Sequence, residues 1–195
     1  DGRPPSFEEQ HLHPDERFLT MVTTALELPS SWRGYFDTST ATMNPHNRGF
    51  GFFPYGTLPI ILVKASGVWL GQAGYDQIHL LGRMLSAFAD LIVVLLTVLL
   101  GRRLYGAPVG LIGGLLMAAA VLPIQQAHFY VVDTFASAFV MLGLFAAARL
   151  RSRPSLGASL GLGFALGAGL ACADGYALRA ARSGDVGRAD IQRAR

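Results

Sequence analysis

Charge and cysteine are scarce in this sequence of 195 residues. Only 15% of the residues are charged, and there is one cysteine, Cys172. A single cysteine excludes a disulfide framework and a thiolate metal site within the chain. The arginines fall mostly at the ends of apolar segments and in the last stretch, which does not match the clustered basic face of a nucleic-acid-binding protein. We therefore expect no nucleic acid partner.

Apolar residues are abundant where charged residues are few. They make up 51% of the sequence, and the mean hydropathy of +0.38 is too high for an ordinary soluble domain of this length. A helix needs roughly 20 mostly apolar residues to cross a bilayer, with roughly 17 as the lower limit. Four stretches meet this condition: residues 84–101, 107–124, 132–148 and 155–173. The sequence therefore predicts an all-α, polytopic transmembrane bundle, with close packing through the small residues of the fourth stretch.

Arginines between the predicted spans predict the orientation of the bundle. Basic residues occupy two turns, Arg102 and Arg103 after the first span and residues 149–153 after the third. Short cytoplasmic loops are enriched in Lys and Arg, so both turns are expected inside. The turn at 125–130 has neither residue and is expected outside, together with residues 1–83. We thus expect a multi-pass protein of the plasma (inner) membrane whose polar residues face the periplasm or the exterior.

Residues 1–83 are expected to form an outer loop with juxtamembrane helices. Periodic apolar residues recur at 17–28 and 57–70, and both segments are too short to span. The second contains Lys64 and ends near Trp69, which is typical of a helix lying at the headgroup level. The Gly-, Pro- and Asn-rich run between them indicates an ordered loop with aromatic anchors.

The two ends of the sequence do not fit a complete membrane protein. Residues 174–195 carry five arginines on the side that alternation makes the outer one. Either the fourth stretch does not cross, or this polar tail is not the authentic continuation, as in a truncated or frame-shifted sequence; we favour the second. Because the chain opens with Asp1 and has no leader, we also expect an N-terminal part to be missing.

Acidic residues at two distant positions are the candidates for chemistry. His13, Pro14, Asp15 and Glu16 open the first amphipathic segment, and this pattern is also that of an ordinary helix N-terminus. Asp133 stands at the outer start of the third span, where a capping role competes with a functional one. Because all three carboxylates are predicted on the same side, they can converge on one site.

Two further charges lie in or beside the first predicted span. Asp90 lies inside it, where an unpaired charge is costly, so we expect it to face the bundle interior or to be protonated. Arg83 stands at its outer end, where its side chain either snorkels to the interface or binds a lipid phosphate.

Taken in order, several segments resemble the dolichyl-phosphate-mannose-type protein mannosyltransferases. These belong to the GT-C class of polyprenyl-phosphate-dependent glycosyltransferases, which includes bacterial aminoarabinose transferases. The resemblance covers about residues 12–171. Its motifs are HPDERFL, FGFFPYGTLPIILVKA, IHLLGRMLSAFADL, GRRLYG and QQAHFYVVDTFASAFVMLGLFAAARL.

The resemblance implies an inverting sugar transfer from a polyprenyl phosphate to a hydroxyl acceptor on protein, lipid or glycan. It implies catalytic roles for Asp15, as general base, and for Glu16 and Asp133. Substrate-binding roles are implied for four other residues: His13, Tyr55, Arg83 and His128. Arg83 is the first candidate for the charge on the leaving phosphate, and a divalent metal ion is the second.

Similar proteins have many more helices, so this chain alone is expected to be inactive. Two other readings stay open at this point. A transporter or permease fragment would carry ionisable groups near the midplane, and a non-catalytic scaffold would share the fold without the reaction.

Overall fold

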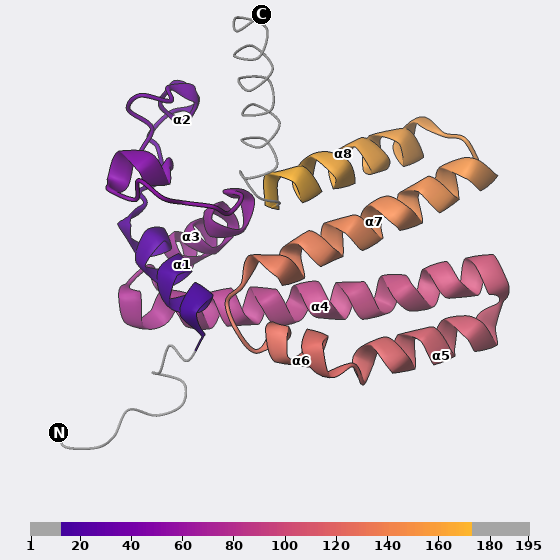
Figure 1. The fold of residues 1–195 in the computed structure, drawn as a ribbon. Coiled ribbons are helices and arrows are strands. Elements are labelled where there is room, and N and C mark those ends of the chain that lie inside the picture. The colour runs from indigo at the N-terminus through magenta and orange to yellow at the C-terminus, as the bar shows by residue number, and fades with distance from the viewer. Residues whose placement is uncertain (1–12, 173–195) are drawn as a thin grey trace, which may run out of the picture.

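A computed structural model describes residues 13–172, and the N- and C-terminal segments, including the predicted polar tail at 174–195, lie outside this description. Within the described residues every regular element is helical. Long helices lie side by side, and short ones gather at one end of them (Figure 1). The elements are α1 (Pro14–Ala25), α2 (Trp32–Phe36), η2 (Pro45–Arg48), α3 (Leu58–Leu70), α4 (Tyr75–Tyr105), α5 (Ala107–Ala118), α6 (Val121–Ala127), α7 (Val132–Ser152) and α8 (Leu156–Cys172).

Two helices of the described chain, α4 and α7, are long and apolar enough to cross a membrane. The pair α5 and α6 makes a third span if it is counted as one. The all-helical fold expected from the sequence is thereby confirmed, and two or three of its helices could span a membrane. Helix α8 has 17 residues and is shorter than the two long helices, so its crossing stays a prediction.

Helix α4 starts at Tyr75, nine residues before the predicted span at 84–101. Its 31 residues extend over about 46 Å at 1.5 Å per residue, which exceeds a hydrocarbon core of about 30 Å. Asp76, Gln77 and His79 lower the hydropathy of this first part and hide the helix from a search for apolar runs. The extension matters because it carries Arg83 beyond the apolar part of the helix.

The second predicted span, 107–124, is not one continuous helix. It breaks after Ala118, and α6 leaves α5 at a bend of 60°. Pro123 explains the position of the break, since proline has no N–H and its ring collides with the carbonyl four residues earlier, that of Ala119. Ala120 accordingly has extended backbone angles, φ −73° and ψ 127°.

Close helix packing occurs through the glycines of α5 rather than those of α8. A Cβ added at Gly110 would come within 2.6 Å of the backbone nitrogen of Arg102, and one added at Gly114 would collide with Val98. In contrast, Gly157 and Gly161 of α8 face open space. The alanines of α8 are the buried small residues instead: Ala158, Ala165 and Ala168.

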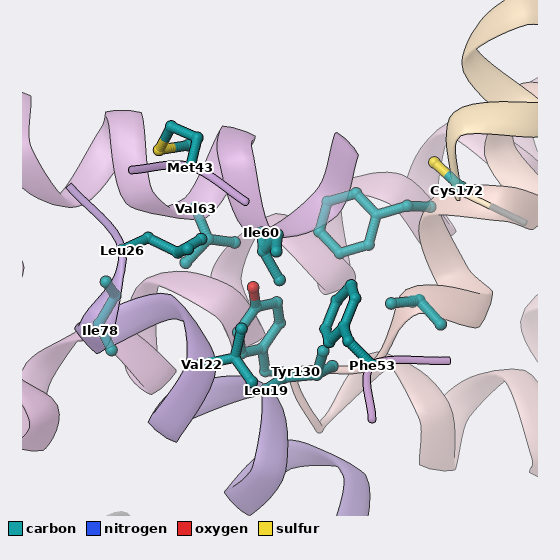
Figure 2. Close-up of a cluster of buried hydrophobic side chains, with 12 residues drawn as sticks. Leu19, Val22, Leu26, Met43, Phe53, Ile60, Val63, Ile78, Tyr130 and Cys172 are labelled. Carbon is teal, nitrogen blue, oxygen red and sulfur yellow. The ribbon is translucent and has the colours of Figure 1, made fainter. Parts of the chain in front are cut away.

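The main hydrophobic core lies at the end of the bundle where the short helices gather. It joins side chains of α1, α3, α4 and α8 with the segment that connects α6 to α7. Figure 2 shows Tyr130 in the middle of this cluster, facing residues of α1 and α3. The buried members are Leu19, Val22, Leu26, Met43, Phe53, Ile60, Val63, Ile78, Tyr130, Val132, Phe135 and Cys172.

The arginine-bearing turns lie at the opposite end of the bundle from α1 and α3 (Figure 1). Arg102 and Arg103 end α4, and Arg149 and Arg151 end α7. Helices α1 to α3 and the turn between α6 and α7 therefore share one end of the bundle, as the sequence predicted from its charges.

Candidate active site

The first turn of α1 presents two carboxylates side by side. Helix α1 begins at Pro14, and the Nδ1 atom of His13 accepts a hydrogen bond from the backbone N–H of Asp15 at 3.2 Å. Asp15 and Glu16 follow in the first turn, where the helix dipole favours negative charge. His13 thus has a local role as the N-cap, which the sequence did not predict.

Glu16 is fully buried and bound to Arg83 of α4. The Nε and Nη2 atoms of Arg83 donate to its two carboxylate oxygens at 2.7 and 3.0 Å, and the Arg83 side chain is only 12% exposed. The backbone N–H of Tyr130 lies 3.4 Å from the Oε1 atom of Glu16. This bidentate geometry is the strongest form of an ion pair between arginine and a carboxylate.

Asp15 lies in a different environment from its neighbour. Its side chain is half-buried, and its carboxylate makes no hydrogen bond or ion pair with any residue of 13–172. Of the two adjacent carboxylates, Glu16 therefore fixes the position of α1 against α4, and Asp15 is the one that remains available to accept a proton.

The segment between α6 and α7 completes the site; the sequence predicted this turn on the outer side and named His128, but it did not single out Phe129. The ring of Phe129 lies 5.3 Å from the ring of His13, and the Cζ atom of Arg83 lies 6.0 Å from the same Phe129 ring. The only signal in the sequence was the position of this aromatic pair, Phe129 and Tyr130, close before Asp133.

Tyr130 fastens this segment to two helices. Its hydroxyl is hydrogen-bonded to the hydroxyl of Thr23 at 3.0 Å, and its ring lies against Gly82, where any Cβ would overlap the ring. Complete burial raises the pKa of Tyr130, with the Thr23 hydrogen bond opposing the shift. The phenol is thus a neutral, fixed group that holds the connection next to the Glu16–Arg83 pair.

Two basic side chains hold the other end of α1. The Nε atom of Arg48 donates to the carbonyl of Ala25 at 2.7 Å, and the Nζ atom of Lys64 donates to the carbonyl of Thr24 at 3.1 Å. Arg48 also pairs with Glu27. Burial lowers the pKa of Lys64, which lies on the inner face of α3. Positive charge at a helix C-terminus is favourable, so both ends of α1 are fixed by charge.

Asp133 does not join Asp15 and Glu16 in one cluster. Its exposed side chain lines a separate cavity of about 270 Å³ together with Asp90 of α4 and Gln126 of α6. The Oε1 atom of Gln126 is buried and has no hydrogen-bond partner among the described residues. The predicted convergence of three carboxylates is thus replaced by one pair at α1 and one pair, Asp90 and Asp133, in this cavity.

The remaining predicted residues have mainly local contacts. The exposed His128 has its Nδ1 atom 2.6 Å from the carbonyl of Ile124. The ring of Tyr55 packs with Phe18 and Phe53 at centroid distances of 6.2 and 5.9 Å. Tyr55 therefore lies beside α1, three residues before the start of α3 at Leu58.

The described residues do not offer a ready site for the divalent ion. Among residues 13–172, no group of three or more His, Cys, Asp or Glu side chains is arranged to hold a metal. The two carboxylates of the cavity alone do not supply the six or more oxygen ligands of a calcium site. A smaller ion such as Mg²⁺ at Asp90 and Asp133 would take its remaining ligands from water or a substrate phosphate.

Comparisons of the chain with protein-family models, curated proteins and solved structures find no match.

Proposed function

We propose that this chain belongs to a membrane glycosyltransferase that moves a sugar from a polyprenyl phosphate to a hydroxyl acceptor on protein, lipid or glycan. The observation that carries the proposal is the placement of Asp15. A half-buried carboxylate without a partner among residues 13–172 stands beside a buried Glu16–Arg83 pair, at the end of a bundle of apolar helices. A lipid-linked donor in the bilayer would present its sugar at this level.

Asp15 is proposed as the general base. Its carboxylate would take the proton of the acceptor hydroxyl while that oxygen attacks the anomeric carbon. The bond between the anomeric carbon and the phosphate oxygen breaks at the opposite face, polyprenyl phosphate leaves, and the configuration inverts. No covalent intermediate with the enzyme is needed.

Glu16 and Arg83 are proposed to act together. Glu16 already holds Arg83 through two hydrogen bonds, so it positions the guanidinium and offsets part of its charge. Arg83 would still attract the leaving phosphate, but less strongly than an unpaired arginine. The ring of Phe129, which lies between His13 and Arg83, would form one wall of the sugar site.

The test is Asp15→Asn in the full-length protein, reconstituted in liposomes with a polyprenyl-phosphate-linked hexose. We expect release of polyprenyl phosphate to fall by about 10²-fold or more, as for loss of a general base. Asp37→Asn is the matched control, because the Asp37 carboxylate is exposed and, among the described residues, bound only by Ser39 and Thr40. Unchanged turnover in a correctly inserted Asp15→Asn protein would refute the role of Asp15.

One observation favours a second function, that of a transporter. The broken pair α5 and α6 lines the cavity that contains Asp90 and Asp133, and broken helices beside ionisable groups are typical of transport sites. Asp90→Asn separates the two functions. Under the transferase proposal it leaves sugar release within a few fold of the parent, whereas under the transporter proposal it abolishes solute uptake into the same liposomes.

A further inference from the structure

The short helix α2 exposes aromatic residues to an unusual extent. Trp32 is 81% exposed and Phe36 is 72% exposed, and none of the five residues of α2 is buried. Burial of apolar surface contributes about 25 cal/mol of favourable free energy per Å². Covering the two large exposed rings of α2 would therefore be considerably favourable. Exposed aromatic clusters of this kind mark a surface that something covers.

The position of α2 along the bundle indicates what covers it. The 17 residues of α8 rise about 25 Å from the arginine end, which is close to the thickness of a hydrocarbon core of about 30 Å. At the far end of α8, the backbone of Ala171 abuts Gly56. Helix α3 begins two residues later, so the predicted crossing of α8 puts the start of α3 near the outer boundary of the hydrocarbon.

Helix α2 lies over this start of α3. Tyr35 and Phe36 line one hollow of about 260 Å³ together with Thr57 and Ile61 of the α3 N-terminus. Figure 1 shows α2 at the same end of the bundle as α1 and α3, away from the arginine turns. The exposed rings are thus placed at the level of the lipid headgroups, where tryptophan is enriched in membrane proteins.

The charge on α2 fits the same partner. Arg33 is exposed and makes no ion pair with the described residues, and the nearby Asp37 is engaged by Ser39 and Thr40. Hydrogen bonds from these two residues lower the pKa of Asp37. The negative charge of Asp37 is therefore engaged by its own loop. Arg33 therefore stands beside two aromatic rings as a cation that pairs with none of the described acidic residues, which suits a phosphate group.

We propose that α2 is a lipid anchor. Trp32 and Phe36 insert among the phospholipid headgroups of the outer leaflet, and Arg33 binds a lipid phosphate. The anchor fixes the loop between α1 and α3 against the membrane and thereby holds α1 at a constant height. It depends on the membrane topology of the chain and not on the proposed sugar transfer.

The two tryptophans make the anchor directly measurable, because Trp32 and Trp69 are the only ones in the chain. In the Trp69→Phe protein, reconstituted in nanodiscs of phosphatidylcholine and phosphatidylglycerol, all tryptophan fluorescence comes from Trp32. We expect headgroup-level nitroxide lipids to remove more of this emission than lipids labelled deep in the acyl chains. Aqueous iodide should quench it at least severalfold less than free tryptophan.

A depth reference comes from Leu95→Trp in a protein that lacks both native tryptophans. Leu95 is an exposed residue in the middle of α4, so its replacement should show the opposite preference, for the deep label. Free quenching of Trp32 by iodide would place α2 in water and overturn the anchor. Protection from iodide and from both lipid labels would show that protein covers α2, which overturns the anchor equally.

Discussion

At the scale of single residues, Glu16 and Arg83 form the ion pair on which the candidate site depends. Glu16 is fully buried, so replacing it with glutamine removes the negative charge from a buried ion pair. Breaking a buried pair in this way costs about 3 kcal/mol or more. We expect Glu16→Gln to lower the midpoint of thermal unfolding, followed by circular dichroism in detergent micelles.

Glu27→Gln is the control for this substitution. Glu27 is paired with Arg48, but its side chain is 66% exposed, and exposed pairs contribute less than about 1 kcal/mol. Equal losses of stability in the two variants would contradict the structural role assigned to Glu16.

The sequence identified candidate residues of this site but not the contacts between them. A proline followed by two acids predicted a helix start at Pro14, and the structure places α1 there. The partner of Glu16 is 67 residues away along the chain, and the backbone contact with Tyr130 spans 114. No local pattern records such distances, so the difference between Asp15 and Glu16 became visible only in three dimensions.

At the scale of elements, α4 and α5 are joined by glycine contacts that leave no room for side chains. A Cβ on Gly110 would lie 2.6 Å from the backbone nitrogen of Arg102, and backbone cannot move aside as a flexible side chain can. Overpacking of this kind costs roughly 1–3 kcal/mol. We expect Gly110→Ala to separate the two helices and to lower the unfolding midpoint in detergent.

Gly113→Ala on the same helix is the matched comparison. Its Cβ would meet only the Cγ2 atom of Thr97, at 3.7 Å, which is an ordinary contact. Alanine also has a higher helix propensity than glycine, so this variant should be neutral or slightly more stable. A loss of stability at Gly113 as large as that at Gly110 would show that helix contact is not the cause.

The sequence predicted those helices whose apolar length a bilayer requires, and it missed features that apolar length does not record. Apolar runs located α7 and the apolar part of α4 because a bilayer imposes a minimum length. The polar first turns of α4 carry no such signal, because the exposed Asp76 and Gln77 interrupt the apolar pattern there. The break before α6 was present in the sequence as Pro123, but the apolar composition around it favoured a single continuous span.

At the scale of the whole molecule, the two ends of the bundle should lie on opposite sides of the membrane. The arginine turns form one end, and the loop that contains Thr38 lies with α1 to α3 at the other. The bias of Lys and Arg toward the cytoplasm predicts that the arginine end is inside. Asp15 would then face the outside, where the proposed sugar transfer requires it.

Single cysteines test this orientation, because Cys172 is the only native one and can be replaced by alanine. In that background, Thr38→Cys and Ser152→Cys place one exposed thiol at each end of the bundle. A membrane-impermeant maleimide added to intact spheroplasts should label position 38 and not position 152, and permeabilisation should make both reactive. Labelling of both from outside would mean that α4 and α7 do not cross, and labelling of 152 alone would reverse the orientation and place Asp15 on the cytoplasmic side.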